Sequence, residues 1–346
     1  MATPAITRLQ RLQNRRIDPS IRVGEVNEAY KRLTTEDTAV RYAIGAMQPI
    51  DPAYTKNTID ERTRVENQLD NGYKATSLTV SFDYQGSVTN DTHIRAHSDV
   101  DLLTVEERFY VVQPPNTPAA IYHGDSVADL RQLRRIAAST LKTAFPAATV
   151  DETSGKAINI SGGSLRREVD VIACNWWHTI EYRQSRQKHW LGIEILDNVK
   201  GIRIPNKPFL HNKLIQDRDT TTNGGLRKII RLLKSMKYDS DEKIDLSSYD
   251  INGIAYNMPD HQLTARVGQD LVLVKNCQAY LSTLRIDRNL RESIETPNKM
   301  RKVFCAEGAT ETGLQQMSAA VDILVQEIEQ GLARSFRKLA EARVSY

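Results

Sequence analysis

The chain has 346 residues, of which 40% are hydrophobic and 26% charged, so its composition is that of a globular protein and excludes a disordered chain. Its apolar runs are much shorter than a membrane span, and the N-terminus lacks the apolar stretch of an export signal. A net charge of +4 is too small for a dense basic face and argues against nucleic-acid binding. Three widely spaced cysteines form no disulfide framework, and we expect a cytoplasmic protein without a membrane partner.

Helical spacing characterises the first 70 residues. Val26, Tyr30 and Leu33 recur at this spacing, and a polar helix that follows Pro52 is predicted to end at Asn71-Gly72 in a left-handed turn. A strand-rich stretch follows, interrupted by a helix over 125–145. The predicted strands are 75–84, 100–103, 108–113, 157–161, 165–174 and 176–182, with Gly162-Gly163 as a hairpin turn.

Beyond residue 200 almost every segment has helical periodicity. The final stretch, 315–342, carries an apolar stripe from Met317 through Leu332 to Phe336, which predicts a helix that faces a core. We therefore divide the chain into a mixed α/β core with N-terminal helices, residues 1–200, and a helical C-terminal lobe, residues 201–346.

Two acidic residues open a strand shortly after a glycine-serine turn, in QGSVTNDTHIRAHSDVDLL. Gly86-Ser87 ends one strand, and Asp99 and Asp101 begin the next. Side chains alternate along a strand, so both carboxylates point to one face while Val100 points to the other, into a core. Paired carboxylates repel each other unless a cation lies between them, and such hard oxygen ligands suit magnesium or manganese.

A third carboxylate, Asp170, is embedded in an apolar strand between Val169 and Val171. If this strand lies beside the first, three carboxylates can hold two divalent ions, one to activate an attacking hydroxyl and one to bind a triphosphate. Gly86 would let the backbone approach a phosphate, and Ser87 would donate to it. Alone, Gly-Ser indicates a turn and Asp-x-Asp a solvated strand end; the ordered combination is what indicates a site.

The helix predicted after Gly225 has two distinct faces. Its buried stripe comprises Leu226, Ile229, Ile230 and Leu233. Arg227, Arg231 and Lys234 occupy another face, and we expect a solvated basic surface for the two arginines.

These motifs resemble the polymerase-beta-like nucleotidyltransferases and, within them, the bacterial cGAS/DncV-like enzymes (CD-NTases). The segments that carry the resemblance are 85–87, 92–94, 99–101, 169–172, 192–193, 208–212, 226–237 and 245–249. The resemblance implies an α+β fold with a mixed-sheet catalytic core, a helical C-terminal lobe and a central cleft. It also implies that Asp99, Asp101 and Asp170 are catalytic and hold two Mg²⁺ or Mn²⁺ ions.

The same resemblance implies the substrate contacts. Gln85 joins Gly86 and Ser87 in the substrate-binding segment. Lys234 would meet the triphosphate as a flexible point charge. Ser248 would touch phosphate, although Ser247 beside it could make that contact, or both could cap a helix. Tyr249 would stack on a nucleobase.

The function implied is synthesis of a cyclic di- or trinucleotide from nucleoside triphosphates. The product would act on a separate effector in anti-phage signalling. One alternative keeps the chemistry but transfers the nucleotide to an RNA, a protein or a small molecule. A second alternative is a binding module on this fold whose acidic residues are idle.

Overall fold

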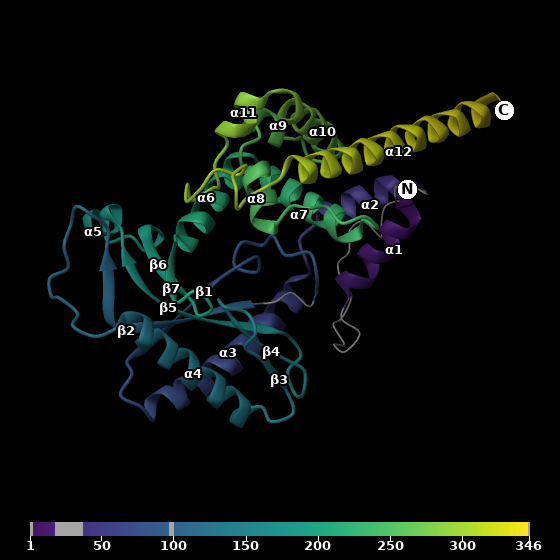
Figure 1. The fold of residues 1–346 in the computed structure, drawn as a ribbon. Coiled ribbons are helices and arrows are strands. Elements are labelled where there is room, and N and C mark those ends of the chain that lie inside the picture. The colour runs from purple at the N-terminus through teal and green to yellow at the C-terminus, as the bar shows by residue number, and fades with distance from the viewer. Residues whose placement is uncertain (1–2, 18–36, 97–99, 345–346) are drawn as a thin grey trace. The chain divides into compact units, whose positions relative to one another are not determined.

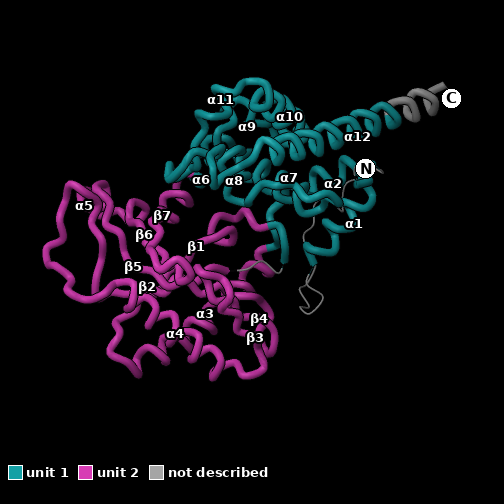
Figure 2. The backbone as a smooth tube through the Cα atoms, viewed as in Figure 1, with its two compact units in different colours: residues 1–51, 94–96, 215–346 teal, residues 52–93, 97–214 magenta. Residues whose placement is uncertain are grey.

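The computed structural model describes residues 3–17, 37–96 and 100–344, with side chains as far as residue 335. The expected helix around Val26, Tyr30 and Leu33 therefore lies outside the described residues, as does Asp99. The chain forms two compact units (Figure 2). Unit 1 comprises 1–51, 94–96 and 215–346, and unit 2 comprises 52–93 and 97–214. None of the described helices is both long and apolar enough to cross a membrane.

Unit 2 is built on a mixed seven-stranded sheet (Figure 1). Its strands are β1 (Val80–Gln85), β2 (Val100–Val112), β3 (Thr149–Asp151), β4 (Ile158–Ser161), β5 (Val169–His178), β6 (Leu191–Asp197) and β7 (Ile202–Asn206). The order is β1-β2-β5-β4-β3, and β6 joins β5 to β7. Only the pairing of β2 with β5 is parallel; the other described pairings are antiparallel.

Two long helices cover one face of this sheet, α3 (Pro52–Lys74) and α4 (Ser126–Ala144). One side of β2 and of β5 packs against these helices in a shared core that includes Leu69, Leu102, Leu133 and Val171. The remaining helical segments are α5 (Ile180–Ser185), η2 (Lys188–Trp190) and α6 (Pro208–Thr221), which continues into unit 1. The other side of β2 and β5 contributes Leu103, Val105, Ile172 and Cys174 to a separate, smaller core. Because side chains alternate along a strand, the same side also carries Asp101 and Asp170.

Three local predictions were wrong. The helix α3 does not stop at Asn71-Gly72 but continues to Lys74. Gly72 is not a left-handed turn residue; it allows close contact with α4, because an added Cβ would lie 2.2 Å from Thr140 Oγ1. The strands predicted at 100–103 and 108–113 form one strand, β2, with an irregular register between Glu106 and Tyr110. Likewise β5 runs unbroken to His178.

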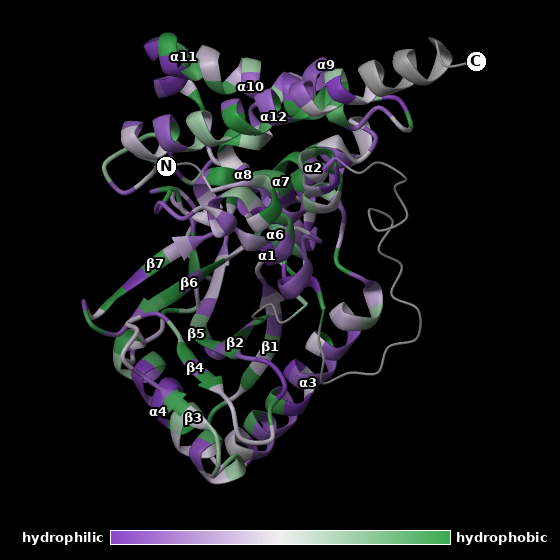
Figure 3. Ribbon diagram, turned by 90° about the vertical axis from the view of Figure 1, so that its right-hand side faces the viewer, coloured by the Kyte–Doolittle hydropathy of each residue, from purple (hydrophilic) through white to green (hydrophobic). Residues whose placement is uncertain are grey.

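Unit 1 is helical. Its helices are α1 (Ala5–Arg16), α2 (Thr38–Met47), α7 (Gly225–Asp239), α8 (Ser248–Tyr256), α9 (Asp260–Leu263), α10 (Leu271–Ile286), α11 (Arg288–Ser293) and α12 (Glu311–Val344). The predicted stripe of α12 is buried at Met317, Leu324 and Ile328, but Leu332 is 41% exposed. In Figure 3 the hydrophobic residues of α7 and α8 stand out in green, and both helices contribute to one continuous core.

The N-terminal helices join the C-terminal helices rather than the sheet. Leu12 of α1 and Met47 of α2 belong to the same hydrophobic core as Leu233 of α7 and Leu324 of α12. The compact units therefore differ from the predicted division at residue 200, because shared apolar burial groups the chain independently of sequence order. The chain passes from unit 2 to unit 1 for the last time in α6, between residues 214 and 215.

Candidate active site

The strands β2 and β5 bring Asp101 and Asp170 together. The two strands are adjacent and parallel, and Asp101 lies directly opposite Asp170 in their register. The neighbours of these residues alternate to the other side, where Leu102 and Val171 are at most 1% exposed in the core beneath the sheet. The two carboxylates consequently share the opposite face of the sheet, which is the strand arrangement that a joint metal site requires.

Polar residues of the flanking strands border the two carboxylates. Asn159 of β4 is in register with Asp170, and its Nδ2 donates to Asp170 Oδ1 at 3.0 Å. Gln85 of β1 is in register with Asp101, and its Oε1 is buried without a hydrogen-bond partner within the described structure. A buried oxygen acceptor without a donor, beside two carboxylates, suits a bound cation or a ligand donor group.

The turn that follows β1 lies directly against Asp101. Gly86 adopts φ +96°, and a Cβ at this position would lie 2.8 Å from Asp101 Oδ2. Two hydrogen bonds close the loop: Thr89 Oγ1 donates to the Gly86 carbonyl at 2.8 Å, and the Thr92 amide donates to the Ser87 carbonyl at 2.9 Å. Glycine is required here both for its backbone conformation and for the close approach.

Asp99, the third predicted metal ligand, lies outside the described residues. Without it, no group of three or more His, Cys, Asp or Glu side chains suitable for a metal ion occurs among the residues that are described. The described donors are the carboxylates of Asp101 and Asp170 and the Gln85 oxygen, which is a hard-oxygen set of the type that Mg²⁺ and Mn²⁺ prefer. The chemistry of these donors fits a divalent cation, and the role of Asp99 stays a prediction.

Lys234 lies on α7 within unit 1 and is only 8% exposed. Burial, followed by repulsion from Arg231 and Arg95, lowers the pKa of Lys234 to about 8. The expected solvated surface was wrong for Arg231, which is 4% exposed and donates through Nε to the Met47 carbonyl at 2.8 Å. Arg227 is mostly buried as well and forms an ion pair with Asp219 at 3.2 Å.

Ser247 and Ser248, at the start of α8, have different environments. Ser247 caps the helix: its hydroxyl accepts from the Asp250 amide at 3.0 Å, and the Asp250 carboxylate accepts from the Ser247 amide in return. Ser248 is the first helical residue and is exposed. The Ser247 hydroxyl is therefore already hydrogen-bonded in the helix cap, which favours Ser248 as the serine that could contact a phosphate.

Tyr249, which is expected to stack on a nucleobase, already contacts other residues of unit 1. Its hydroxyl donates to Asn298 Oδ1, and burial raises its pKa. The Arg301 guanidinium lies 5.2 Å from the ring centroid. One contact of the ring is thus intramolecular, and base stacking by Tyr249 stays a prediction.

The predicted site residues are distributed over both units. Unit 2 contains Gln85, Gly86, Ser87, Asp101 and Asp170, and unit 1 contains Lys234, Ser248 and Tyr249. Sequence reasoning missed Asn159, because nothing in a short strand reveals which residue of a neighbouring strand it will face. It also missed Arg95, although this cation lies inside the motif that connects Gly86 to Asp101.

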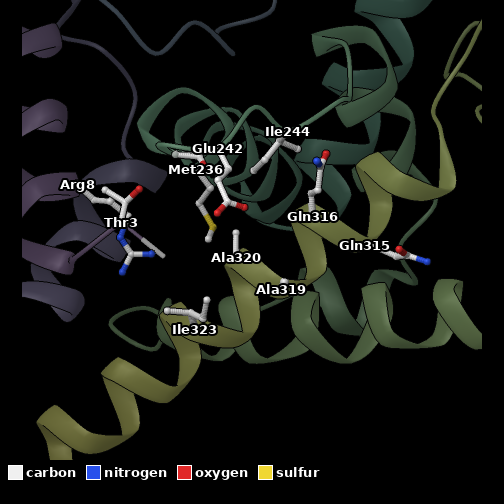
Figure 4. Close-up of a pocket in the computed structure, with 11 residues that line it drawn as sticks. Thr3, Arg8, Met236, Glu242, Ile244, Gln315, Gln316, Ala319, Ala320 and Ile323 are labelled. Carbon is white, nitrogen blue, oxygen red and sulfur yellow. The ribbon is translucent and has the colours of Figure 1, made fainter. Parts of the chain in front are cut away.

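A separate cavity of about 370 Å³ lies within unit 1 (Figure 4). It is bordered by Arg8, Met236, Glu242, Gln316 and Ile323, among other residues of α1, α7, α12 and the segment after α7. None of the described residues predicted to bind metal or substrate lines it. The candidate active site is therefore the part of β2 and β5 that carries Asp101 and Asp170, not this cavity.

Comparisons with known proteins identify the family. The model of the cGAS/DncV-like nucleotidyltransferase C-terminal helical domain matches residues 213–329. The cyclic dinucleotide synthase CdnE of Yersinia aleksiciae is 36% identical over 88% of this chain and 81% of its own length. The c-di-GMP synthase of a Lachnospiraceae bacterium, strain RUG226, is 33% identical over 68% of this chain and 74% of its own.

A solved structure extends the similarity to nearly the whole chain. The STING-associated CdnE c-di-GMP synthase from Capnocytophaga granulosa superposes with a TM-score of 0.78 at 26% sequence identity. The match covers 95% of this chain and 99% of that protein. The similarity therefore includes both the sheet of unit 2 and the helices of unit 1.

Proposed function

This chain belongs to the cGAS/DncV-like nucleotidyltransferase family, and we propose that it makes its cyclic dinucleotide with divalent metal ions held by Asp99, Asp101 and Asp170. It is an enzyme, a nucleotidyltransferase, and its relatives are cyclic dinucleotide synthases. The observation that carries the metal proposal is the register of β2 and β5, which places Asp101 directly opposite Asp170 on one face of the sheet. Mg²⁺ or Mn²⁺ bound there would lower the pKa of an attacking hydroxyl and neutralise charge on the triphosphate.

In one nucleotidyl-transfer step, the three aspartates are assigned different roles. A 2′- or 3′-hydroxyl of one nucleotide attacks the α-phosphorus of the other, a P–O bond forms, and the bond to pyrophosphate breaks as the hydroxyl loses its proton. Asp170 would lie nearest the attacking hydroxyl, and Asp99 and Asp101 would be shared between two ions. A second identical step closes the ring, so that two triphosphates yield one cyclic dinucleotide and two pyrophosphates.

The phosphates of the donor nucleotide are assigned to the glycine-serine turn and to unit 1. Gly86 has a positive φ and lies directly against Asp101. On this proposal the backbone N–H groups of the turn and the Ser87 hydroxyl donate to the phosphate oxygens. Lys234 and Ser248 supply a cation and a hydroxyl for the triphosphate, and Tyr249 supplies a ring for the base. Gln85 supplies the buried oxygen beside Asp101.

We propose c-di-GMP as the product and a separate protein effector as its receptor. The Lachnospiraceae relative is a c-di-GMP synthase, and the Capnocytophaga protein is described as both a c-di-GMP synthase and STING-associated. On this proposal the product is the second messenger of an anti-phage response, and the synthase itself needs no nucleic acid.

The function is tested by incubating the purified protein with labelled nucleoside triphosphates and Mg²⁺ but without any acceptor. We expect a phosphatase-resistant product whose mass corresponds to a cyclic dinucleotide, and c-di-GMP when all four triphosphates are present. Asp170→Asn should reduce its formation by at least about 100-fold, because the carboxylate pair loses half its charge. Label incorporated into RNA or protein instead would identify a different acceptor and refute the cyclase proposal.

Two glycines provide a matched control for the turn in the same assay. Gly86 and Gly162 both have positive φ, +96° and +77°, so alanine at either costs about 1 kcal/mol of backbone strain. Only at Gly86 would the new Cβ meet Asp101, whereas nothing lies within 4 Å of it at Gly162. Gly86→Ala should abolish product formation and Gly162→Ala should retain it; equal activity of the two variants would contradict the assigned role of the turn.

A further inference from the structure

A buried ionic cluster links three helices of unit 1. The Arg15 guanidinium of α1 forms an ion pair through Nη1 with Oδ1 of Asp239, the last residue of α7, and the Tyr42 hydroxyl of α2 donates to Asp239 Oδ2 at 2.9 Å. Arg15 is 8% exposed, and the other two residues are fully buried. Burial raises the pKa of the Tyr42 phenol, which keeps it protonated as a donor.

Hydrophobic residues could fill this space without the desolvation cost of a buried ion pair. Stabilisation of the fold therefore explains the cluster poorly, and orientation of the Arg15 side chain explains it better. Its carboxylate is fixed on both sides: Tyr42 and Arg15 engage the two oxygens of Asp239, and Arg11 Nη1 donates to the Asp239 carbonyl at 2.6 Å. The Arg15 guanidinium is consequently held in one orientation.

The oriented arginine holds the segment Ile94–Ala96. Arg15 Nε donates to the Ile94 carbonyl at 3.2 Å, and the Ala96 amide donates to the Arg15 carbonyl at 2.9 Å. Between these contacts, the Arg95 guanidinium lies 4.8 Å from the centroid of the Tyr238 ring, and that of Arg15 lies 5.5 Å from it. All three residues of the segment are therefore bound to α1 or α7.

This segment has a special place in the chain. It is the one stretch between residues 52 and 214 that belongs to unit 1, and it separates the Gly86-Ser87 turn from the strand β2. Asp101 is only the fifth residue after Ala96. The point at which Ile94–Ala96 is held therefore limits how the chain can enter the strand that carries a proposed metal ligand.

We propose that Arg15 is a positioning residue for the metal-binding carboxylates: by holding Ile94–Ala96, it fixes the entry of the chain into β2 and hence the placement of Asp101 toward a divalent cation. The inference rests on the proposed function for the identity of that cation. It assigns the N-terminal helix a part in the chemistry although α1 contributes no ligand. Arginine suits this task because its planar guanidinium donates to the Asp239 carboxylate and to the Ile94 carbonyl at the same time. The single ammonium group of lysine makes two such directed hydrogen bonds poorly.

The test compares variants that break the same type of interaction in the same helix. Arg15→Gln removes the contact to Ile94, and Arg15→Lys keeps the charge without the fork. Tyr42→Phe removes only the hydroxyl that orients Asp239. The matched control is Arg8→Gln: Arg8 also lies on α1, is 4% exposed and forms an ion pair with Glu327 of α12, but its described contacts do not include Ile94–Ala96.

Two measurements separate positioning from stability. The affinity for Mn²⁺ alone, without nucleotide, is titrated from the electron paramagnetic resonance signal of the free ion, and the Tm of each variant is measured in parallel. Arg15→Gln and Arg15→Lys should weaken Mn²⁺ binding by about tenfold, the scale of an outer-shell substitution at a metal site. Tyr42→Phe should weaken it by a smaller factor, and Arg8→Gln should leave it unchanged at a similar loss of Tm.

The outcomes are distinct. Wild-type Mn²⁺ affinity in Arg15→Gln, or an equal loss in Arg8→Gln, overturns the positioning role. If Arg15→Gln does not fold, Tyr42→Phe decides: weakened binding supports the inference, and unchanged binding refutes it. A wild-type protein that binds Mn²⁺ yet forms no cyclic product would refute the proposed function instead, and the comparison of Mn²⁺ affinities would still decide the role of Arg15.

Discussion

At the scale of single residues, burial determines how a charge behaves. Arg231 was predicted to be solvated on the basic face of α7, but it is buried and donates to the Met47 carbonyl. Lys234, on the same face, is buried as well. The cost of desolvating its ammonium leaves Lys234 with a pKa of about 8, near the pH at which such an enzyme would work. The charge that we assign to the triphosphate is therefore sensitive to pH.

Triphosphate binding should weaken above pH 8. Protonated Lys234 is the form that attracts phosphate, and because its pKa is lowered to about 8 the charge is present below that pH and is lost as the pH rises through it. The KM for the donor triphosphate should rise about fivefold between pH 8 and pH 9. Steady-state kinetics with Lys234→Arg, whose guanidinium stays protonated, should show a flat profile.

Lys228 offers the control for this profile. It lies on the same helix but forms an ion pair with Asp270 at 2.8 Å. Lys228→Gln should keep the wild-type pH dependence. A steep profile that persists in Lys234→Arg would exclude Lys234 as its origin.

At the scale of elements, the first turn of α8 shows how local chemistry assigns different roles to neighbours. The reciprocal hydrogen bonds between Ser247 and Asp250 satisfy amides that the helix cannot satisfy itself. Asp250 also pairs with Arg301 at 2.5 Å, so the cap is connected to the segment before α12. Ser248, one residue later, is outside this network of cap contacts.

Alanine substitutions at the two serines should therefore have different effects. Ser247→Ala should lower the free energy of unfolding by about 1 kcal/mol through loss of the cap, with a small effect on the KM for triphosphate. Ser248→Ala should leave stability within about 0.5 kcal/mol and raise that KM. Denaturant unfolding and steady-state kinetics on both variants provide the measurement, and the reverse pattern would transfer the phosphate contact to Ser247.

At the scale of the whole molecule, the chain builds unit 1 from three separate segments. α1 and α2 complete the core of the C-terminal helices, and Ile94–Ala96 adds the third segment from within the sheet-forming part of the chain. The chain passes between the two units four times, at 51/52, 93/94, 96/97 and 214/215. Substitutions in the core of α1 should consequently destabilise helices that are more than 200 residues away in sequence.

Paired core truncations test this grouping. Leu12 of α1 and Leu69 of α3 are both fully buried, one in each unit, and alanine at either should cost about 2–5 kcal/mol. Leu12→Ala should accelerate hydrogen exchange in α7 and α12, whereas Leu69→Ala should accelerate it in β2 and α4. Faster exchange in the sheet after Leu12→Ala would instead support a division of the chain near residue 200.

The sequence alone determined the strands, and it predicted the chemistry that they carry. Val100 and Leu102 flank Asp101, and Val169 and Val171 flank Asp170, so both carboxylates lie on the face opposite these core residues. Helical periodicity predicted the buried stripe of α7. These features depend on the backbone period, which is local and can be read from one chain. The family resemblance added the assignment of a nucleotidyltransferase.

Only the tertiary structure decided which segments meet. The parallel pairing of β2 with β5, the approach of Asn159 to Asp170 and the burial of Arg231 all depend on contacts between residues far apart in sequence. The same holds for α1, whose Arg15 holds Ile94–Ala96 across some 80 residues. Local periodicity determines which face of an element is apolar, but the partner of that face is set by packing of the whole chain.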